Sequence, residues 1–383
     1  MAIVINGSGT VTGLAVGGLP DGIVDAGTLA TNSVDSAELI DGAVDDSHMA
    51  SIKGRKNLII NGKMKVAQRG SVATAASGYN TIDRFKFTNS TDGAYTSEQS
   101  SEAPDGFGSS VKLDVTTADT SISAAQYATF RQAIEGQNVQ HLKWGTADAQ
   151  DITVSFWVRS SKTGTYTIAI QKTPATEYYY TSEYSISSAD TWEKKTITIP
   201  ALTNASSNSA FANTSNGGLI LFFGLSYGAN HTAGATNNTW NTAGDIGLAS
   251  QVNWLDSTSN DFYITGIQLE LGSTATNFEQ RHRGEELALC QRYYINRKIN
   301  AVGAEYGSYD NLIWMYQYDM RASPSFSIPS GNISDDFVGG TFSYTPTGNY
   351  IDSEGLRISY YLGSTSILGG RSYSADVVFD AEL

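Results

Sequence analysis

Cysteine, proline and charged residues are all scarce in this chain of 383 residues. Charged residues make up 16%, below the roughly 25% that is usual for a soluble domain. The one cysteine, Cys290, excludes a framework of disulfides within the chain and a zinc site built from several cysteines. No apolar run approaches the roughly 18 residues of a membrane-spanning helix, and the N-terminus shows no secretory signal.

Positive charge is the scarcer sign. The chain has 24 Lys and Arg against 38 Asp and Glu, which gives a net charge of −14, and it contains no basic block. Nucleic acids and anionic membranes recruit positively charged surfaces. We therefore expect neither nucleic acid nor membrane insertion among the interactions of this protein.

The motifs that would indicate an enzyme are missing as well. The sequence contains no nucleophile elbow, no zinc-binding HExxH helix and no phosphate-binding loop. The four histidines have no metal-ligand spacing. We expect no catalytic residues, no cofactor and no assignable metal ligands, although a structural calcium ion held by carboxylate and carbonyl oxygens stays open. The sequence thus predicts a protein that is not an enzyme.

The first 56 residues differ from the rest of the chain. Every Phe, Trp and Tyr lies after residue 78, and residues 1–52 contain neither Lys nor Arg. From residue 14 onward, an apolar residue recurs at every fifth position without a miss. The eight positions are Leu14, Leu19, Val24, Leu29, Val34, Leu39, Val44 and Met49.

A period of five indicates a fibrous segment. It matches neither the period of a helix nor that of a strand, and a fixed repeat is typical of stacked, nearly one-dimensional structures. One apolar residue in five cannot form a core within one chain, so we expect several copies to wind together and bury this seam. A flexible acidic linker and a single-chain pentapeptide coil are the alternatives, although such a coil would complete only about two turns.

Strand signals separated by turn residues begin at residue 57. The clearest runs are 111–115, 152–159, 166–170, 195–199, 219–223 and 262–271. The runs 152–159 and 166–170 flank Gly164 and predict a hairpin of adjacent strands. The run 219–223 is apolar on both faces and predicts a central, buried strand. Many short strands with little helix predict a mostly β fold, a two-sheet sandwich over residues 57–280.

One short helix separates this region from a second β region. Residues 284–294 have acidic residues in the first turn and a basic residue near the end, and both suit the helix dipole. Leu287, Cys290 and Tyr294 share one face, and three such helices around an axis could form a joint. Cys290 is then a packed residue rather than a nucleophile. We expect a linker helix within 281–295 and a C-terminal β head over 296–383.

Aromatic and amide side chains suggest where a sugar would bind. Proteins hold neutral sugars with aromatic faces and a few well-placed polar groups, and long loops on a β scaffold usually carry function. The candidate ligand-binding residues are His231, Asn238 and Trp240, in the loop between Tyr227 and Trp254, and Tyr306 and Tyr309 at the C-terminal tip. Packing of Trp240 and Trp254 into the core of the sandwich is the alternative.

Several segments resemble those of bacteriophage tail-fibre and receptor-binding proteins. They are RKNLIING at 55–62, QRG at 68–70, DRF at 83–85, QLELGS at 268–273, ATNFEQR at 275–281 and EELALCQRYY at 285–294. The resemblance covers most of the chain to about residue 295. It implies a carbohydrate-binding-like jelly roll at 57–280, a homotrimeric fibre, and attachment to the phage tail or an adaptor protein through residues 1–56.

The function that the resemblance implies is attachment. The expected protein is a virion tail-fibre component that binds a host cell-surface glycan non-covalently, through several copies of one weak site. A tail-spike polysaccharide depolymerase on the same scaffold is one alternative. A purely structural adaptor between other fibre proteins is the second.

Overall fold

The computed structural model describes most of residues 55–383 and two short strands before them. The described residues are 4–5, 11–12, 55–73, 77–173, 177–203, 210–306, 309–313, 315–316, 320–329, 332–335, 341–343, 356–357 and 372–383. The chain divides into two units, Met1–Lys53 and Gly54–Leu383. In the first, β1 (Val4–Ile5) pairs antiparallel with β2 (Val11–Thr12). The eight residues of the five-residue seam lie outside the described residues, so the multichain stalk stays a prediction.

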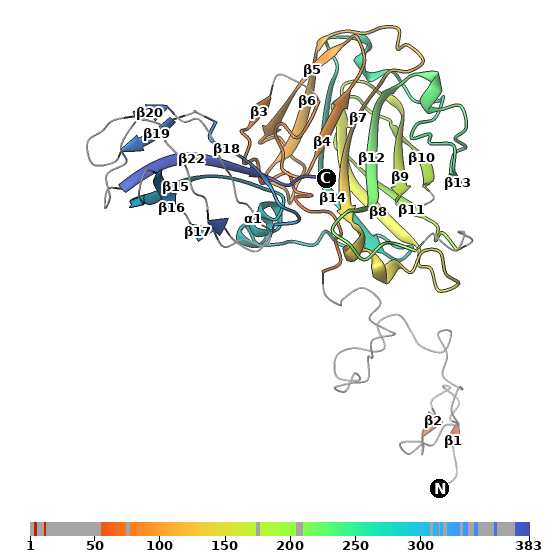
Figure 1. The fold of residues 1–383 in the computed structure, drawn as a ribbon. Coiled ribbons are helices and arrows are strands. Elements are labelled where there is room, and N and C mark those ends of the chain that lie inside the picture. Colours follow the sequence, from red (N-terminus) through yellow and green to blue (C-terminus); the bar gives the residue numbers. More distant parts are fainter. Residues whose placement is uncertain are drawn as a thin grey trace. The chain divides into compact units, whose positions relative to one another are not determined.

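Two six-stranded antiparallel sheets form the sandwich of the second unit (Figure 1). The first sheet has the strand order β13-β10-β9-β12-β7-β4. Its strands are β4 (Lys86–Asn89), β7 (Tyr127–Glu135), β9 (Gly164–Lys172), β10 (Tyr178–Ile186), β12 (Gly217–Tyr227) and β13 (Thr239–Asn241). Strand β12 pairs with β7 on one side and β9 on the other, which confirms the central strand predicted from its apolar run.

The second sheet has the order β11-β8-β14-β6-β5-β3. Its strands are β3 (Val72–Ala73), β5 (Ala94–Ser100), β6 (Ser110–Thr117), β8 (Ile152–Ser160), β11 (Glu193–Ile199) and β14 (Asp261–Leu271). Short 3-10 helices in the connections are η1 (Gly136–Asn138), η2 (Gln140–Leu142), η3 (Ala229–His231) and η4 (Trp254–Asp256). The mostly β fold and the two-sheet sandwich are thereby confirmed.

The hairpin expected from residues 152–159 and 166–170 is wrong. Strand β8 pairs with β11 and β14 in the second sheet, whereas β9 pairs with β10 and β12 in the first. The chain crosses from one sheet to the other at residues 161–163, and Gly164 starts β9 with a φ of +129° that favours glycine. Alternating residues predicted both strands correctly. The alternation does not distinguish two paired strands of one sheet from two strands in opposite sheets. In both cases every second side chain points into the core.

Aromatic rings fill the space between the sheets. Phe130 of β7 lies nearly parallel to Phe223 of β12, with ring centroids 4.7 Å apart. Phe156 of β8 meets Phe223 edge-on at 5.2 Å. Trp254 is fully buried and lies 5.5 Å from Tyr95, as the core alternative for Trp254 predicted. Full burial of one such side chain contributes about 1.5–3 kcal/mol, so these contacts fix the spacing of the two sheets.

The first residues of the second unit run along β14. The Leu58 N–H donates to the Leu269 carbonyl oxygen at 2.8 Å, and the Ile267 N–H donates to the Gly62 oxygen at 3.0 Å. The Asn57 side-chain amide donates to the Ile267 oxygen at 3.1 Å. Residues near position 60 therefore satisfy backbone hydrogen-bonding groups of residues near position 268, and the reverse.

The predicted helix is confirmed as α1 (Arg283–Gln291). It ends before Tyr294, so Tyr294 does not share its face with Leu287 and Cys290; Tyr294 begins the next strand instead. Cys290 is fully buried in a cluster with Ile60 and Tyr293, which confirms a packed thiol. A joint formed by three such helices stays a prediction.

A third sheet follows α1, with the order β16-β15-β22-β19-β20, and β18 also pairs with β22. Its strands are β15 (Tyr294–Tyr306), β16 (Tyr309–Ile313), β18 (Ser325–Ser327), β19 (Asn332–Asp335), β20 (Thr341–Ser343) and β22 (Ser372–Asp380). A separate pair joins β17 (Met315–Tyr316) and β21 (Leu356–Arg357). The second β region expected after the helix is therefore present.

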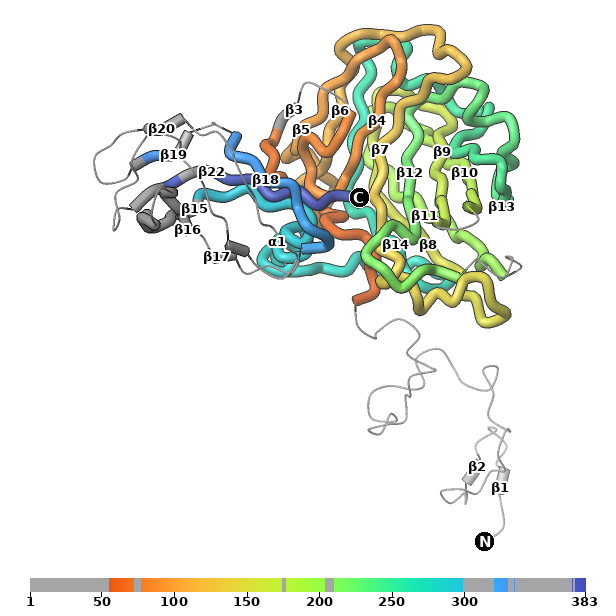
Figure 2. The backbone as a smooth tube through the Cα atoms, viewed as in Figure 1, coloured from red at the N-terminus to blue at the C-terminus, as the bar shows by residue number. Residues whose placement is uncertain are grey.

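Ion pairs, of which those to Glu382 are buried, fasten the C-terminal end of the chain to the sandwich, where Figure 2 shows it returning. The Arg84 side chain is 1% exposed and pairs with Glu382, which is 4% exposed. The Arg84 guanidinium carbon also lies 3.3 Å from the centroid of the Tyr293 ring. Arg69 pairs with Glu382 at 3.3 Å and with Asp380 at 3.2 Å. These four charged side chains make the end of β22 part of the same packed body.

Candidate functional site

A hollow of about 350 Å³ opens on the outer face of the second sheet, which faces away from the core. We call it the aromatic pocket. It is lined by Gly106, Phe107, Ser155, Trp157, Lys194, Gly266, Thr276, Asn277, Phe278 and Gln280. Its volume falls within the range of about 300–1,000 Å³ that is typical of small-molecule pockets. Three of its lining side chains are aromatic and none is a carboxylate.

Strand β8 supplies the floor of the aromatic pocket. Its alternation turns Val154 and Phe156 into the core, where they are fully buried, and turns Ser155 and Trp157 outward. Lys194 of β11 stands opposite Trp157 in the register. Directly paired residues of neighbouring strands share a face, so the indole ring and the ammonium group border the same space.

The hollow exists because β14 bulges at its middle. The register between β14 and β8 shifts between Thr265 and Gln268, and Gly266 has a φ of +63° there. A Cβ atom on Gly266 would lie 2.7 Å from the Phe107 ring and 3.2 Å from Trp157 Cδ1. Glycine provides both the left-handed backbone conformation and the space between the two rings.

Residues 276–280 form one wall of the aromatic pocket. The side-chain oxygen of Gln268, which is fully buried, accepts a hydrogen bond from the Glu279 N–H at 2.8 Å. Phe278 meets Phe107 edge-on, with ring centroids 5.2 Å apart. A part-buried hydrogen bond and a ring contact hold the wall in place, so a ligand would not have to order it.

Four polar groups in the lining have no partner within the described part of the chain. They are the Ser155 hydroxyl, the Trp157 indole N–H, the Asn277 side-chain amide and the Lys194 ammonium group. Aromatic faces cover the apolar C–H side of a sugar ring, and such donors and acceptors reach its hydroxyl groups. The arrangement is therefore suited to a saccharide.

Of the residues predicted from the sequence, His231 lies on the first sheet. Its ring centroid is 4.5 Å from that of Tyr127 of β7. Its Nε2 lies 3.1 Å from the Ala125 carbonyl oxygen. The loop that carries His231 also packs Ile246 against Phe222 on this sheet, so part of the loop covers the sheet instead of leaving its face open.

Asn238 and Trp240 interact with the sandwich itself. The Asn238 side-chain oxygen accepts a hydrogen bond from the Ser182 hydroxyl at 2.7 Å. Trp240 meets Trp144 edge-on at 5.2 Å, and its N–H donates to the Pro200 carbonyl oxygen at 3.0 Å. The structure does not bring these residues to the aromatic pocket, and their part in binding stays a prediction.

The two candidate tyrosines of the tip are neighbours in the backbone. Tyr306 of β15 and Tyr309 of β16 are register partners. Their side chains lie outside the described part of the structure. Their part in binding also stays a prediction.

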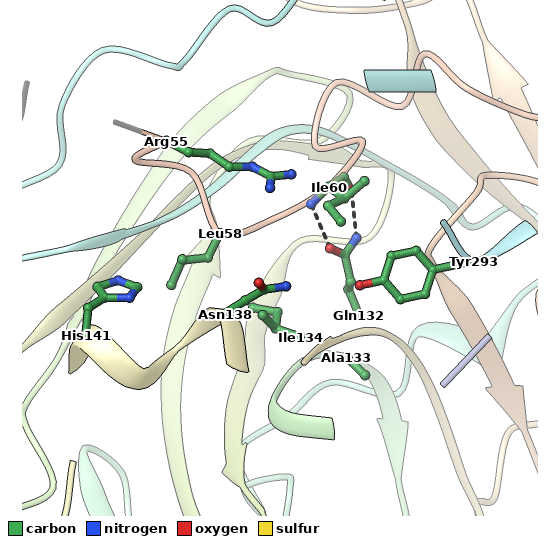
Figure 3. A pocket seen from close by; sticks show the side chains of 9 residues that line it. All are labelled: Arg55, Leu58, Ile60, Gln132, Ala133, Ile134, Asn138, His141 and Tyr293. Carbon is green, nitrogen blue, oxygen red and sulfur yellow. Dashed lines mark hydrogen bonds between the residues drawn. The ribbon is translucent and has the colours of Figure 1, made fainter. Parts of the chain in front are cut away.

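A second cavity, of about 220 Å³, lies beside β7 (Figure 3). It is lined by Arg55, Leu58, Ile60, Gln132, Ala133, Ile134, Asn138, His141 and Tyr293. The Gln132 side chain bonds both the N–H and the carbonyl oxygen of Ile60, each at 2.8 Å. The Tyr293 hydroxyl donates to Glu135 at 2.5 Å, and Arg84 covers the Tyr293 ring. The Gln132 amide and the Tyr293 ring are already engaged, and Tyr293 is the only Phe, Tyr or Trp in this lining, so the cavity offers a sugar fewer aromatic faces than the aromatic pocket.

Metal-ligating residues do not cluster in the part of the chain that the structure describes. No group of three or more His, Cys, Asp and Glu there could hold a metal ion. Nor do the described residues include a helix that is long and apolar enough to cross a membrane.

The sequence contained a usable signal for the aromatic pocket. In the alternating run 152–159, Trp157 falls in the polar phase with Ser155 and Arg159, and a large aromatic residue there is turned outward. The run 275–281 resembles a tail-fibre segment but does not by itself indicate a binding site, yet it supplies Phe278 to the wall. Gly266 gave no such signal, because a bulge depends on the partner strand.

No protein family and no curated protein matches the sequence. The enzymatically active domain of tailspike protein 4 from bacteriophage CBA120 is a similar solved structure, at 13% identity and a TM-score of 0.31, covering 56% of this chain and 21% of that one. A family 11 carbohydrate-binding module of a Clostridium thermocellum cellulase has 10% identity and a TM-score of 0.26, covering 54% and 98%. The module TmCBM61, in complex with β-1,4-galactotriose, has 9% identity and a TM-score of 0.26, covering 57% and 99%.

The chain thus spans about a fifth of the length of the tailspike structure that it matches. The β-sandwich rests on the strand order of this chain alone.

Proposed function

We propose that this protein binds a host-surface glycan without cleaving it, as a component of a bacteriophage tail fibre. The observation that carries the proposal is the aromatic pocket, in which Phe107, Trp157 and Phe278 border polar groups that have no partner in the described residues. Rings and hydrogen-bonding groups of this kind are the usual elements of a saccharide site. The segments that resemble tail-fibre proteins support a location of this site on a virion.

Binding without cleavage is supported by the chemistry of the lining. Hydrolysis of a glycosidic bond generally requires two carboxyl groups, about 5–9.5 Å apart, on either side of the scissile bond. The lining of the aromatic pocket contains no Asp or Glu. A tail-spike depolymerase remains the alternative, and release of reducing ends from host polysaccharide would establish it.

A fibre of several chains is supported by the five-residue seam, and the resemblance to tail-fibre proteins implies that the number of chains is three. Three weak sites on one fibre raise the effective concentration of the glycan and increase avidity by perhaps 10²–10⁴. Three chains of 40.9 kDa predict about 123 kDa in light scattering. A value near 41 kDa would reject the trimer, and a protein that binds neither cells nor glycans would favour the adaptor.

The test compares two aromatic variants of the full chain on a glycan array and on host cells. Trp157→Ala removes the floor of the aromatic pocket, and we expect it to abolish most of the binding. Tyr127→Ala is the matched control, because this partly exposed ring lies on the other sheet, beside His231. We expect Tyr127→Ala to bind like the wild type.

The opposite result would show that the glycan binds elsewhere on the protein. If Tyr127→Ala loses binding and Trp157→Ala keeps it, the glycan binds on the first sheet near His231. If neither variant differs from the wild type, deletion of residues 296–383 tests whether the tip holds the site.

A further inference from the structure

The rim of the aromatic pocket is positive, although the whole chain carries a net charge of −14. Lys194 belongs to the lining. Lys63 borders it: the Lys63 Nζ lies 6.0 Å from the centroid of the Phe278 ring and donates a hydrogen bond to Gln280. A ligand in the pocket therefore meets two ammonium groups and no lining carboxylate.

Carboxylates next to the lining are engaged by other groups: Glu193 pairs with Lys195 at 2.5 Å, and Glu270 accepts hydrogen bonds from the N–H and the hydroxyl of Thr276. Glu279 pairs with Arg281 at 2.9 Å and accepts a hydrogen bond from the Asn57 N–H at 2.7 Å. Asp105 is exposed on the loop before Gly106. Lys194 has no ion-pair partner among the residues that the structure describes. Its ammonium group is available to an anion.

The electrostatic surroundings of Lys63 also favour binding of an anion. Burial, followed by the nearby charge of Lys65, lowers the pKa of Lys63, and the charge of Glu286 opposes this only in part. An anion beside Lys63 would offset both effects, because opposite charge favours the protonated amine. The geometry leads to the same expectation independently, since Lys63 and Lys194 both border the one hollow.

A second hollow, distinct from the cavity beside β7, lies across one loop from the aromatic pocket and also carries a lysine. This hollow has a volume of about 300 Å³ and is lined by Lys65, Gln99, Ser100, Ser101, Gly108 and Ser109. Gly106 and Phe107 line the aromatic pocket, and the next two residues of the same loop line the second hollow. The Ser109 hydroxyl donates to the Lys63 carbonyl oxygen at 2.9 Å, which ties the loop to the segment that carries both lysines. A polymer that crosses the loop would meet lysines on both sides.

We propose that the aromatic pocket binds an anionic pyranose, a uronic acid or another carboxylate-bearing sugar, within an acidic host polysaccharide. The rings of Phe107, Trp157 and Phe278 cover the C–H face of the sugar, and Lys194 and Lys63 pair with its carboxylate. The second hollow receives an adjoining sugar next to Lys65. This inference rests on the proposed glycan-binding function, and it replaces the neutral sugar considered for the aromatic and amide candidate residues.

The test uses pairs of oligosaccharides that differ only in charge. Oligomers of galacturonate, glucuronate and mannuronate, and the methyl ester of each, are titrated calorimetrically into the full-length protein. We expect the acid of at least one pair to bind about tenfold more tightly than its ester, and this preference to shrink as salt screens it. Lys194→Gln should weaken binding of the acid about fivefold and leave the ester unchanged.

Lys143→Gln is the control for charge. It removes the same charge from an exposed lysine that pairs with Asp148 and lines neither hollow, so we expect wild-type binding. Equal affinity for acid and ester, or an unchanged preference in Lys194→Gln, would overturn the anionic sugar and leave glycan binding in place. If no acidic or neutral glycan binds in these titrations or on the array, the proposed function fails as well.

Discussion

Replacing Glu382 with glutamine should destabilise the sandwich far more than its position beyond the last strand suggests. The substitution keeps the shape of the side chain and removes its charge. Arg84, which is 1% exposed, then keeps a buried cation whose carboxylate partner is gone. Its donation to the Ala133 carbonyl oxygen at 2.7 Å and its stacking on Tyr293 remain, but neither carries a negative charge.

The expected magnitude follows from the burial of both partners. Burial by itself lowers the pKa of Arg84, and Glu382 is the main influence that more than offsets this, so the pKa is raised overall. Removal of one partner from a buried pair typically costs about 3–5 kcal/mol. Asp380→Asn is the matched control: its side chain is 38% exposed and pairs with Arg69 at 3.2 Å. An exposed pair of this kind contributes at most about 1 kcal/mol.

Urea denaturation followed by tryptophan fluorescence measures the difference, because most of the tryptophans lie in the sandwich. With a denaturant dependence of about 3 kcal/mol per molar urea, Glu382→Gln should lower the midpoint by about 1–1.7 M. Asp380→Asn should lower it by no more than about 0.3 M. If the two variants shift the midpoint equally, the buried cation does not depend on Glu382 and the reasoning is wrong.

Three further predictions concern other parts of the second unit. Burial, opposed by hydrogen bonds from Gln68 and by the charge of Arg69, raises the pKa of Asp83 from 3.8 to about 6; the folded protein then binds more protons than the unfolded chain between these values. The free energy of unfolding should fall as pH rises through that window, by up to about 3 kcal/mol, and Asp83→Asn should remove the slope from denaturation curves. Gly266→Ala should lose about 1–2 kcal/mol of stability and most glycan binding in calorimetry, and wild-type affinity would contradict the account of the pocket. Burial raises the pKa of the Cys290 thiol, so a thiol reagent should label it only in urea, whereas fast labelling of the native protein would contradict its packing.

Local patterns in the sequence predicted the strands well. Alternation identified 111–115 and 195–199, and both lie within strands of the second sheet. The continuous apolar run at 219–223 became the inner strand β12. These features depend on which residues face the core, and the order of residues along one strand records that directly.

Contacts between distant segments could not be predicted in the same way. The partners of β8 are β11 and β14, and nothing in residues 152–159 specifies them. The aromatic pocket combines a loop at 106–107, a strand at 155–157 and a wall at 276–280. Trp157 could have been suspected from its outward position. Its neighbours in space, Phe107 and Phe278, follow only from the assembled sheet.

The pairing of residues near 60 with β14 also has a consequence for synthesis of the protein. Leu58 and Gly62 form backbone hydrogen bonds with Leu269 and Ile267. The first residues of the sandwich can therefore pair only with a strand that is synthesised roughly 200 residues later. At about 5–20 residues per second, that delay is on the order of 10–40 s. From its own synthesis until the end of this delay, β8 has no β14 beside it, and an unpaired edge of this kind favours aggregation. The nascent chain should therefore require protection by chaperones until residue 271 has left the ribosome.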